Sequence, residues 1–175
     1  MEIVLYVVMI FLLLYCTERD NKLKYLSKKA IGDIGENIVS NRLSQLNDNY
    51  IVQHDVHLGR AQIDHLVFNH DKELIFTIET KLWGGIIAGH RDDEEWTQRI
   101  DGVIKYLENP IKQNEFHCRE VRKYYPNYHV YSIVCFIKNK RVPKCKCIMN
   151  EDNIVNFITK TTSKITDKGK MHQII

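Results

Sequence analysis

Residues 62–81, QIDHLVFNHDKELIFTIETK, predict two β-strands joined by a short turn. Strands are expected at 62–69 and 73–81, because both segments are rich in apolar and β-branched residues. The polar residues 70–72 supply the turn between them. A hairpin of this kind brings a residue near the start of the first strand beside one near the end of the second.

The segments on either side alternate between strand and helix patterns. An amphipathic helix is expected at 28–46, with Gly35 on its packing face and Glu36 at the edge of that face. Asn109 is a good N-cap for a helix that has Pro110 in its first position. The remaining predictions are strands at 50–58, 128–137 and 146–149, and helices at 96–107, 110–125 and 152–161.

This order of elements predicts an α/β fold with a central mixed sheet flanked by helices. With 44% hydrophobic and 27% charged residues, the chain has a globular composition rather than a disordered or fibrous one. Its 175 residues suffice for a core without disulfide bonds. The five cysteines have no framework spacing and are expected to be free thiols, with Cys135 buried in an apolar run.

Acidic and basic residues on the two strands form the candidate site. Glu79 and Lys81 point to the same face of their strand because strand side chains alternate, and the hairpin brings Asp64 close to Glu79. Two carboxylates close together in a half-buried place repel each other, and a divalent cation turns that repulsion into coordination. Oxygen ligands suit Mg²⁺ or Mn²⁺. The alternative is a pair of acids at strand ends with Lys81 as their ion-pair partner.

Several motifs together resemble a known family. The segments GDIGENIVSNRL, QIDHLVF, IFTIETKLWGG, EEW and NPIKQNEFH occur in the order typical of the nuclease-related domain, NERD, over roughly residues 29–140. That domain is a branch of the PD-(D/E)XK nuclease superfamily. One departure is Ile63, which stands where the superfamily name has a proline; a proline side chain donates no ligand, so the metal prediction is unaffected.

The resemblance implies a restriction-endonuclease-like core and a catalytic set of Asp64, Glu79, Lys81 and Gln113. It also implies that Asp64 and Glu79 bind Mg²⁺ (or Mn²⁺), with Glu36 as a further acidic residue that joins them through a water. The expected activity is metal-dependent phosphodiester hydrolysis of nucleic acid, DNA in preference to RNA. The alternative is a non-catalytic module of the same fold that binds nucleic acid or a protein.

The N-terminus carries an uncharged apolar run, IVLYVVMIFLLLYC, at residues 3–16. A membrane-anchor helix is expected here. Basic residues from Arg19 to Lys29 follow the run, and they place the rest of the chain in the cytoplasm as a single-pass membrane protein. A cleaved signal peptide and a buried core helix are the alternatives.

The predicted organisation is therefore a membrane-anchor helix at 1–17, a basic tether at 18–28, the nuclease-related domain at 29–160 and a basic tail at 161–175. Residues 30–137 carry five more acids than bases, whereas residues 138–175 carry six more bases than acids. The basic end suits a nucleic-acid backbone or lipid headgroups. His65 and His90 are expected to be structural or surface residues, and Trp83 and Trp96 core residues.

Overall fold

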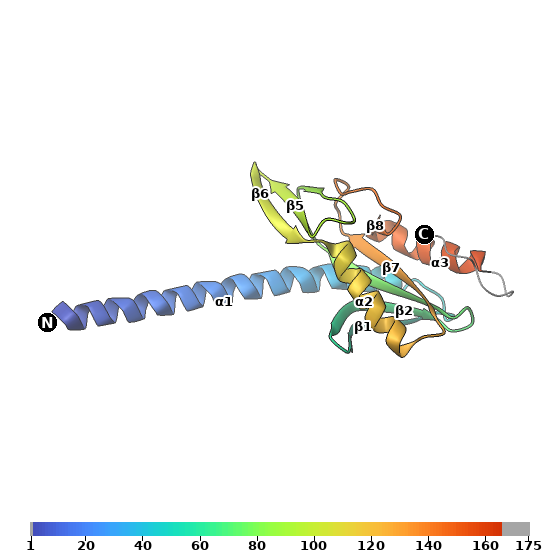
Figure 1. Cartoon of the computed structure of the whole chain (residues 1–175), viewed down its shortest axis with the longest axis horizontal. Helices are drawn as coiled ribbons and strands as arrows, with labels where there is room; N and C mark the ends of the chain where they lie inside the picture. The colour runs from blue at the N-terminus through green and yellow to red at the C-terminus, as the bar shows by residue number, and fades with distance from the viewer. Residues whose placement is uncertain (1, 166–175) are drawn as a thin grey trace. The chain divides into compact units, whose positions relative to one another are not determined.

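The computed structural model describes the backbone of residues 2–165, and the side chains from Tyr15 onward except that of Lys24. The chain divides into two compact units between Ile34 and Gly35. Helix α1, Glu2–Leu43, makes up the first unit and supplies the beginning of the second. The second unit holds both sheets (Figure 1), and all the candidate site residues belong to it.

The main sheet has five strands in the order β1-β2-β3-β7-β8. Strands β1 to β3 are antiparallel, whereas β3, β7 and β8 are parallel, so the predicted mixed sheet is confirmed. The strands are β1 Ile51–Leu58, β2 Ala61–Asn69, β3 Leu74–Lys81, β7 His129–Phe136 and β8 Ile148–Asn150. All five predicted strands lie within two residues of these bounds at each end, because their apolar runs end at turn residues.

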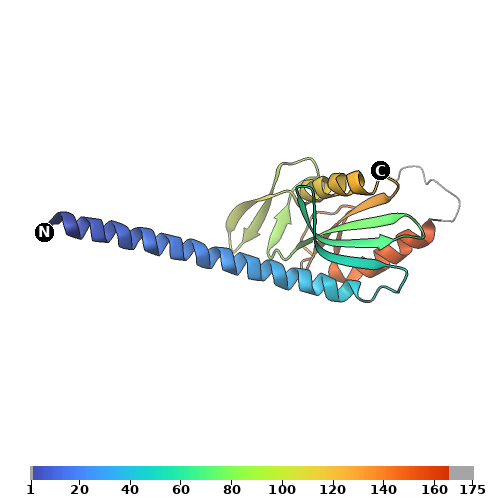
Figure 2. The same ribbon diagram turned by 90° about the horizontal axis from the view of Figure 1, so that it is seen from below.

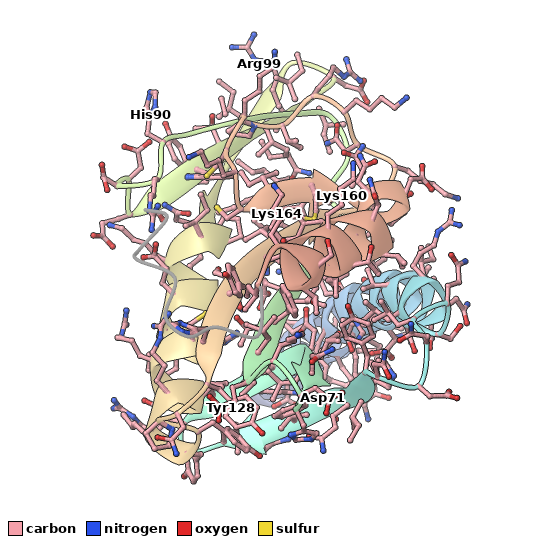
Figure 3. All side chains as sticks on the ribbon, turned by 90° about the vertical axis from the view of Figure 1, so that its right-hand side faces the viewer. Asp71, His90, Arg99, Tyr128, Lys160 and Lys164 are labelled. Carbon is pink, nitrogen blue, oxygen red and sulfur yellow. The ribbon has the colours of Figure 1, made fainter. Side chains whose placement is uncertain are left out.

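Helices cover both faces of this sheet. The end of α1 and helix α3, Ile154–Lys164, pack on one face, where Val39, Ile158 and Phe76 share a core. Helix α2, Pro110–Tyr124, packs on the other, where Val121 meets Phe68. Figure 2 shows α2 on one side of the sheet and α3 on the other. A short 3₁₀ turn, η1 Glu151–Asn153, leads into α3, which carries Lys160 and Lys164 (Figure 3).

A glycine allows α1 to approach the sheet closely. A Cβ atom added to Gly35 would lie 3.3 Å from side-chain atoms of Thr80, Leu82 and Ile137. Thr80 follows Glu79, so this contact sets α1 against the strand end that carries the candidate site. The expected role of Gly35 in close packing is confirmed.

A second, three-stranded antiparallel sheet, β4-β5-β6, replaces a predicted helix. The expected helix at 96–107 is wrong, because the segment forms β5 Glu95–Ile100 and β6 Val103–Glu108, which pair with β4 Ile86–Ala88. Asp101 and Gly102 between them have φ values of 48° and 80°. Positive φ at both central residues is the turn that tight hairpins prefer, and Asp-Gly is a common sequence for it.

The prediction of a membrane-spanning N-terminus is also wrong. Among the described residues, no helix is both long and apolar enough to cross a membrane, which contradicts the single-pass anchor with a cytoplasmic domain. The uncharged run covers only 14 residues, about 21 Å of helix against a hydrocarbon core of about 30 Å. No separate apolar helix forms, because α1 continues unbroken through the charged residues from Glu18 onward. The side chains of residues 3–14 and the predicted basic tail beyond residue 165 lie outside the described residues.

Candidate functional site

Asp64 and Glu79 lie where two neighbouring strands separate. The β2–β3 ladder ends at the pair His65 and Ile78, although β2 begins at Ala61 and β3 continues to Lys81. In place of a ladder bond, the Thr80 backbone N–H donates a hydrogen bond to Asp64 Oδ2 over 2.7 Å. The gap between the strands is therefore occupied by the Asp64 carboxylate, with Glu79 next to its hydrogen-bond donor.

Lys81 joins strand β3 to helix α2. Its Nζ donates to Glu79 Oε1 at 2.6 Å and to Gln113 Oε1 at 2.9 Å. The side chain of Lys81 is 15% exposed and that of Glu79 only 3%, so this ion pair is shielded from solvent. The structure thus brings together Asp64, Glu79, Lys81 and Gln113.

His117 completes the surroundings of Glu79 and was missed in the sequence. Its Nδ1 lies 3.3 Å from Glu79 Oε2, and both side chains are buried. The contact is close but poorly aligned, since neither atom has a hydrogen-bond partner among the described side chains. The available signal was spacing, because His117 follows Gln113 by four residues and therefore lies on the same face of α2.

The surroundings of Asp64 and Glu79 shift the pKa values of the two carboxyl groups in opposite directions. Burial raises the pKa of Asp64 to about 8, with help from the charges of Glu79 and Glu36 and against the Thr80 hydrogen bond. Burial acts the same way on Glu79, but His117 and Lys81 outweigh it and hold the pKa of Glu79 below its ordinary value. Burial therefore favours the protonated form of Asp64, and a cation close to it would favour the ionised form.

These surroundings fit a hard divalent cation. The negative charges of Glu79 and Glu36 act on Asp64 more strongly than the positive charge of Lys81. Glu79 Oε2 is a buried oxygen without a hydrogen bond in the described part of the chain. Within that part, no group of three His, Cys, Asp or Glu side chains is placed to hold a metal. An ion here would have Asp64 and Glu79 as its protein carboxylates and would keep several waters, as Mg²⁺ usually does. Glu36 acts on Asp64 through its charge.

The start of helix α2 is positioned by two buried asparagines. Asn109 caps the helix by accepting from the Ile111 N–H, while its amide donates to the carbonyls of His90, Arg91 and Asp93. The Asn114 amide donates to Thr77 O and Ile133 O on the two central strands. These bonds fix α2 on the sheet and so place Gln113 beside Lys81. The predicted cap, with Pro110 in the first turn, is confirmed.

The other singled-out residues have structural places. His65 Nδ1 lies 2.8 Å from His54 Nδ1, and burial, together with His54, lowers the pKa of His65 to about 4. His90 is exposed at the small sheet (Figure 3). Trp96 is fully buried and Trp83 partly buried against the same cluster, as predicted. Cys135 is buried, and all five cysteines are free thiols, as expected.

Comparisons with known proteins point to one family. A family model described as "Nuclease-related domain" matches residues 31–137. An uncharacterized protein of Bacillus anthracis is 33% identical over 96 aligned residues, in a match that covers 51% of this chain and 44% of the relative. The chain thus spans less than half the length of that relative. No solved structure matches the chain.

Proposed function

This chain belongs to the nuclease-related domain family, and from that premise we propose that it is a metal-dependent nuclease. Membership of the family supports a nuclease-related function and contact with nucleic acid. The finer proposal is hydrolysis of phosphodiester bonds with Mg²⁺ or Mn²⁺ bound, on DNA in preference to RNA.

One observation carries the proposal, the gathering of the Asp64 carboxylate and the Lys81 and Gln113 side chains around the buried Glu79. The ionised form of Asp64 is unfavourable beside Glu79 unless something compensates its charge. A bound divalent cation compensates directly, and perturbed groups of this kind gather at functional sites. The carboxylates of Asp64 and Glu79 offer oxygen ligands to a cation, and Lys81 offers a positive charge beside them.

Each residue has a distinct proposed role. Asp64 and Glu79 hold the cation, which when bound supplies charge to polarise the phosphate and activate water. Lys81 orients the attacking water or stabilises the negative charge that develops on the phosphate. Gln113 holds the Lys81 ammonium and contacts substrate or water from the first turns of α2. Glu36 influences Asp64 through its charge from the adjacent helix.

The alternative is a non-catalytic module of the same fold that binds nucleic acid or a protein. Its support is the closed pair of Lys81 and Glu79, in which the ammonium already binds the carboxylate at 2.6 Å. If this pair persists with a nucleic acid bound, Lys81 and Glu79 neutralise each other, and binding occurs without hydrolysis.

A cleavage assay separates the two. Labelled single-stranded DNA, duplex DNA and RNA are incubated with the protein in Mg²⁺, in Mn²⁺ and in EDTA. We expect cleavage only with a cation, and at least a hundredfold less with Glu79→Gln or Lys81→Met, on the order of the loss of one charge-stabilising group. Lys105→Met, which removes an exposed lysine on β6, is the matched control.

The outcomes have definite meanings. Cleavage by both Glu79→Gln and Lys81→Met at the wild-type rate would show that the site lies elsewhere. Binding of nucleic acid without cleavage under any cation would support the binding module instead.

A further inference from the structure

Two arginines from different elements converge on one aromatic ring near the candidate site. The guanidinium carbon of Arg60 lies 5.9 Å from the centre of the Phe116 ring, and that of Arg119 lies 5.7 Å from it. Arg60 is in the β1–β2 turn and Arg119 in α2, and both are exposed. Phe116 is partly buried against the β2 core.

The positive charge of these two arginines is only partly balanced by nearby acids. Among the side chains that the structure describes, neither forms an ion pair. Glu120 lies against the β1–β2 turn and its charge acts on Arg60, but its carboxylate also binds Lys123 at 2.5 Å. Glu115 binds Arg91 at 2.6 Å. A cation over an exposed aromatic ring gains only about 0.5–1 kcal/mol. This gain is small, and the two guanidinium groups repel each other, so an anion bound between them would be favourable.

The helix connects this cluster to the candidate site. Gln113 and His117 contact the Lys81 and Glu79 side chains, and Phe116 and Arg119 follow on the same helix. At 1.5 Å per residue, Arg119 lies about 9 Å along the axis from Gln113.

The β1–β2 turn packs against the same stretch of α2. A Cβ added to Gly59 would lie 2.5 Å from Glu120 Oε2, and its φ of +58° suits glycine. This close approach brings Arg60 to the helix and holds it near Phe116.

We propose that Arg60 and Arg119 bind the phosphate backbone of the substrate strand, one or two nucleotides from the bond that is cleaved. Guanidinium groups match phosphate oxygens with paired hydrogen bonds, and the Phe116 ring holds them in position. This inference rests on the proposed nuclease function, because it assumes that the scissile phosphate lies at Asp64 and Glu79. The ligand is a nucleic-acid strand recognised through its charge rather than its bases.

Binding without cleavage provides the test. Fluorescence anisotropy with a labelled DNA oligonucleotide is measured in EDTA over a range of salt concentrations. Arg60→Ala and Arg119→Ala are each expected to weaken binding about tenfold and to lower the salt slope by about one, since each removes one phosphate contact. Arg119→Lys keeps the charge and is expected to bind with intermediate affinity.

Arg99→Ala is the matched control. Arg99 is an exposed arginine on the small sheet, at the opposite end of the domain from Tyr128 in Figure 3. Its loss is expected to leave affinity within about twofold of wild type, because it contributes only long-range charge. Circular dichroism melts of every variant check that the fold is retained.

The results distinguish this proposal from the proposed function. If the arginine variants bind like Arg99→Ala while the wild type cleaves DNA, the phosphate-binding proposal fails and the nuclease stands. If both variants lose binding but the wild type never cleaves, the surface stands and the nuclease fails. Absence of any binding by the wild type would overturn the proposed surface.

Discussion

At the scale of single residues, the main feature of the site is the difference in environment between the carboxylates of Asp64 and Glu79. Asp64 is half-buried with one backbone hydrogen bond, whereas Glu79 is buried and has a lysine and a histidine against it. Loss of solvent raises the pKa of Asp64, while the lysine and the histidine lower that of Glu79. A difference of this kind between two acids is typical of sites that bind cations or move protons.

The raised pKa of Asp64 leads us to expect an unusual pH dependence of stability when no divalent cation is present. Its pKa in the folded state, about 8, lies above that in the unfolded chain. The stability that the protonated Asp64 side chain contributes is therefore fully present at acidic pH. It is lost as the pH rises towards 8, because Asp64 ionises more readily in the unfolded chain than in the folded one. We expect the free energy of unfolding to fall by a few kcal/mol, at about 1.4 kcal/mol per pKa unit.

Urea unfolding between about pH 5.5 and 8.5 measures this slope. Glu79, whose pKa is lowered, contributes the opposite slope only at lower pH, as it protonates. Asp64→Asn should remove the loss of stability, and Mg²⁺ should remove it from the wild type. An equal slope in Asp64→Asn would assign the effect to another group.

At the scale of elements, the cap of α2 is the support of the site. Asn109 is fully buried, and its amide donates to three backbone carbonyls in residues 90–93 while its oxygen accepts from Ile111. The loop that follows β4 is thereby tied to the helix that carries Gln113 and His117.

Asn109 both caps helix α2 and holds the loop at residues 90–93, and substitutions are expected to separate these two roles. Asn109→Ala should destabilise the domain by about 3 kcal/mol or more, because it removes the cap and leaves buried carbonyls without donors. Asn109→Asp keeps the acceptor but loses the amide donors, so it should be destabilised through the loop alone. Thermal melts of both variants check this. Equal stability of Asn109→Ala and the wild type would contradict it.

The contact between α1 and β3 leads to a further prediction at this scale. Gly35→Leu should destabilise the domain by about 2 kcal/mol or more, because the added side chain has no room against Thr80 and Leu82. Gly84→Ala is the control, since a Cβ there meets nothing within 4 Å. Chemical denaturation compares the two, and similar small changes would show that α1 shifts without cost.

At the scale of the molecule, the described residues from Gly35 onward form a compact unit that contains both sheets. A chain shortened to begin at Lys28 should therefore unfold in one cooperative transition, within a few degrees of the full-length protein. It keeps Val39 and Leu43, which belong to the core. Calorimetry of both proteins, with and without Mg²⁺, measures this. A broad or much lower transition would mean that the first 27 residues are needed for the fold.

Much of this fold was predictable because its signals are local. The hairpin of β2 and β3, the cap at Asn109 and the buried strand β7 follow from runs of neighbouring residues. The small sheet was not recognised because its apolar residues also fit a helix, and only the Asp101-Gly102 turn distinguishes a hairpin. The predicted anchor was wrong because α1 continues into charged residues without the apolar length of a membrane span.

The sequence by itself determined which chemical groups stand at the ends of two adjacent strands, because strand periodicity and turn chemistry act over a few residues. Only the tertiary structure decided how those groups are charged and which others join them. His117 is 38 residues from Glu79 in the chain, and the two meet because α2 packs across the sheet. Burial raises the pKa of both carboxylates, and the contacts of Glu79 with Lys81 and His117 separate its behaviour from that of Asp64. Those contacts depend on how β3 and α2 pack together.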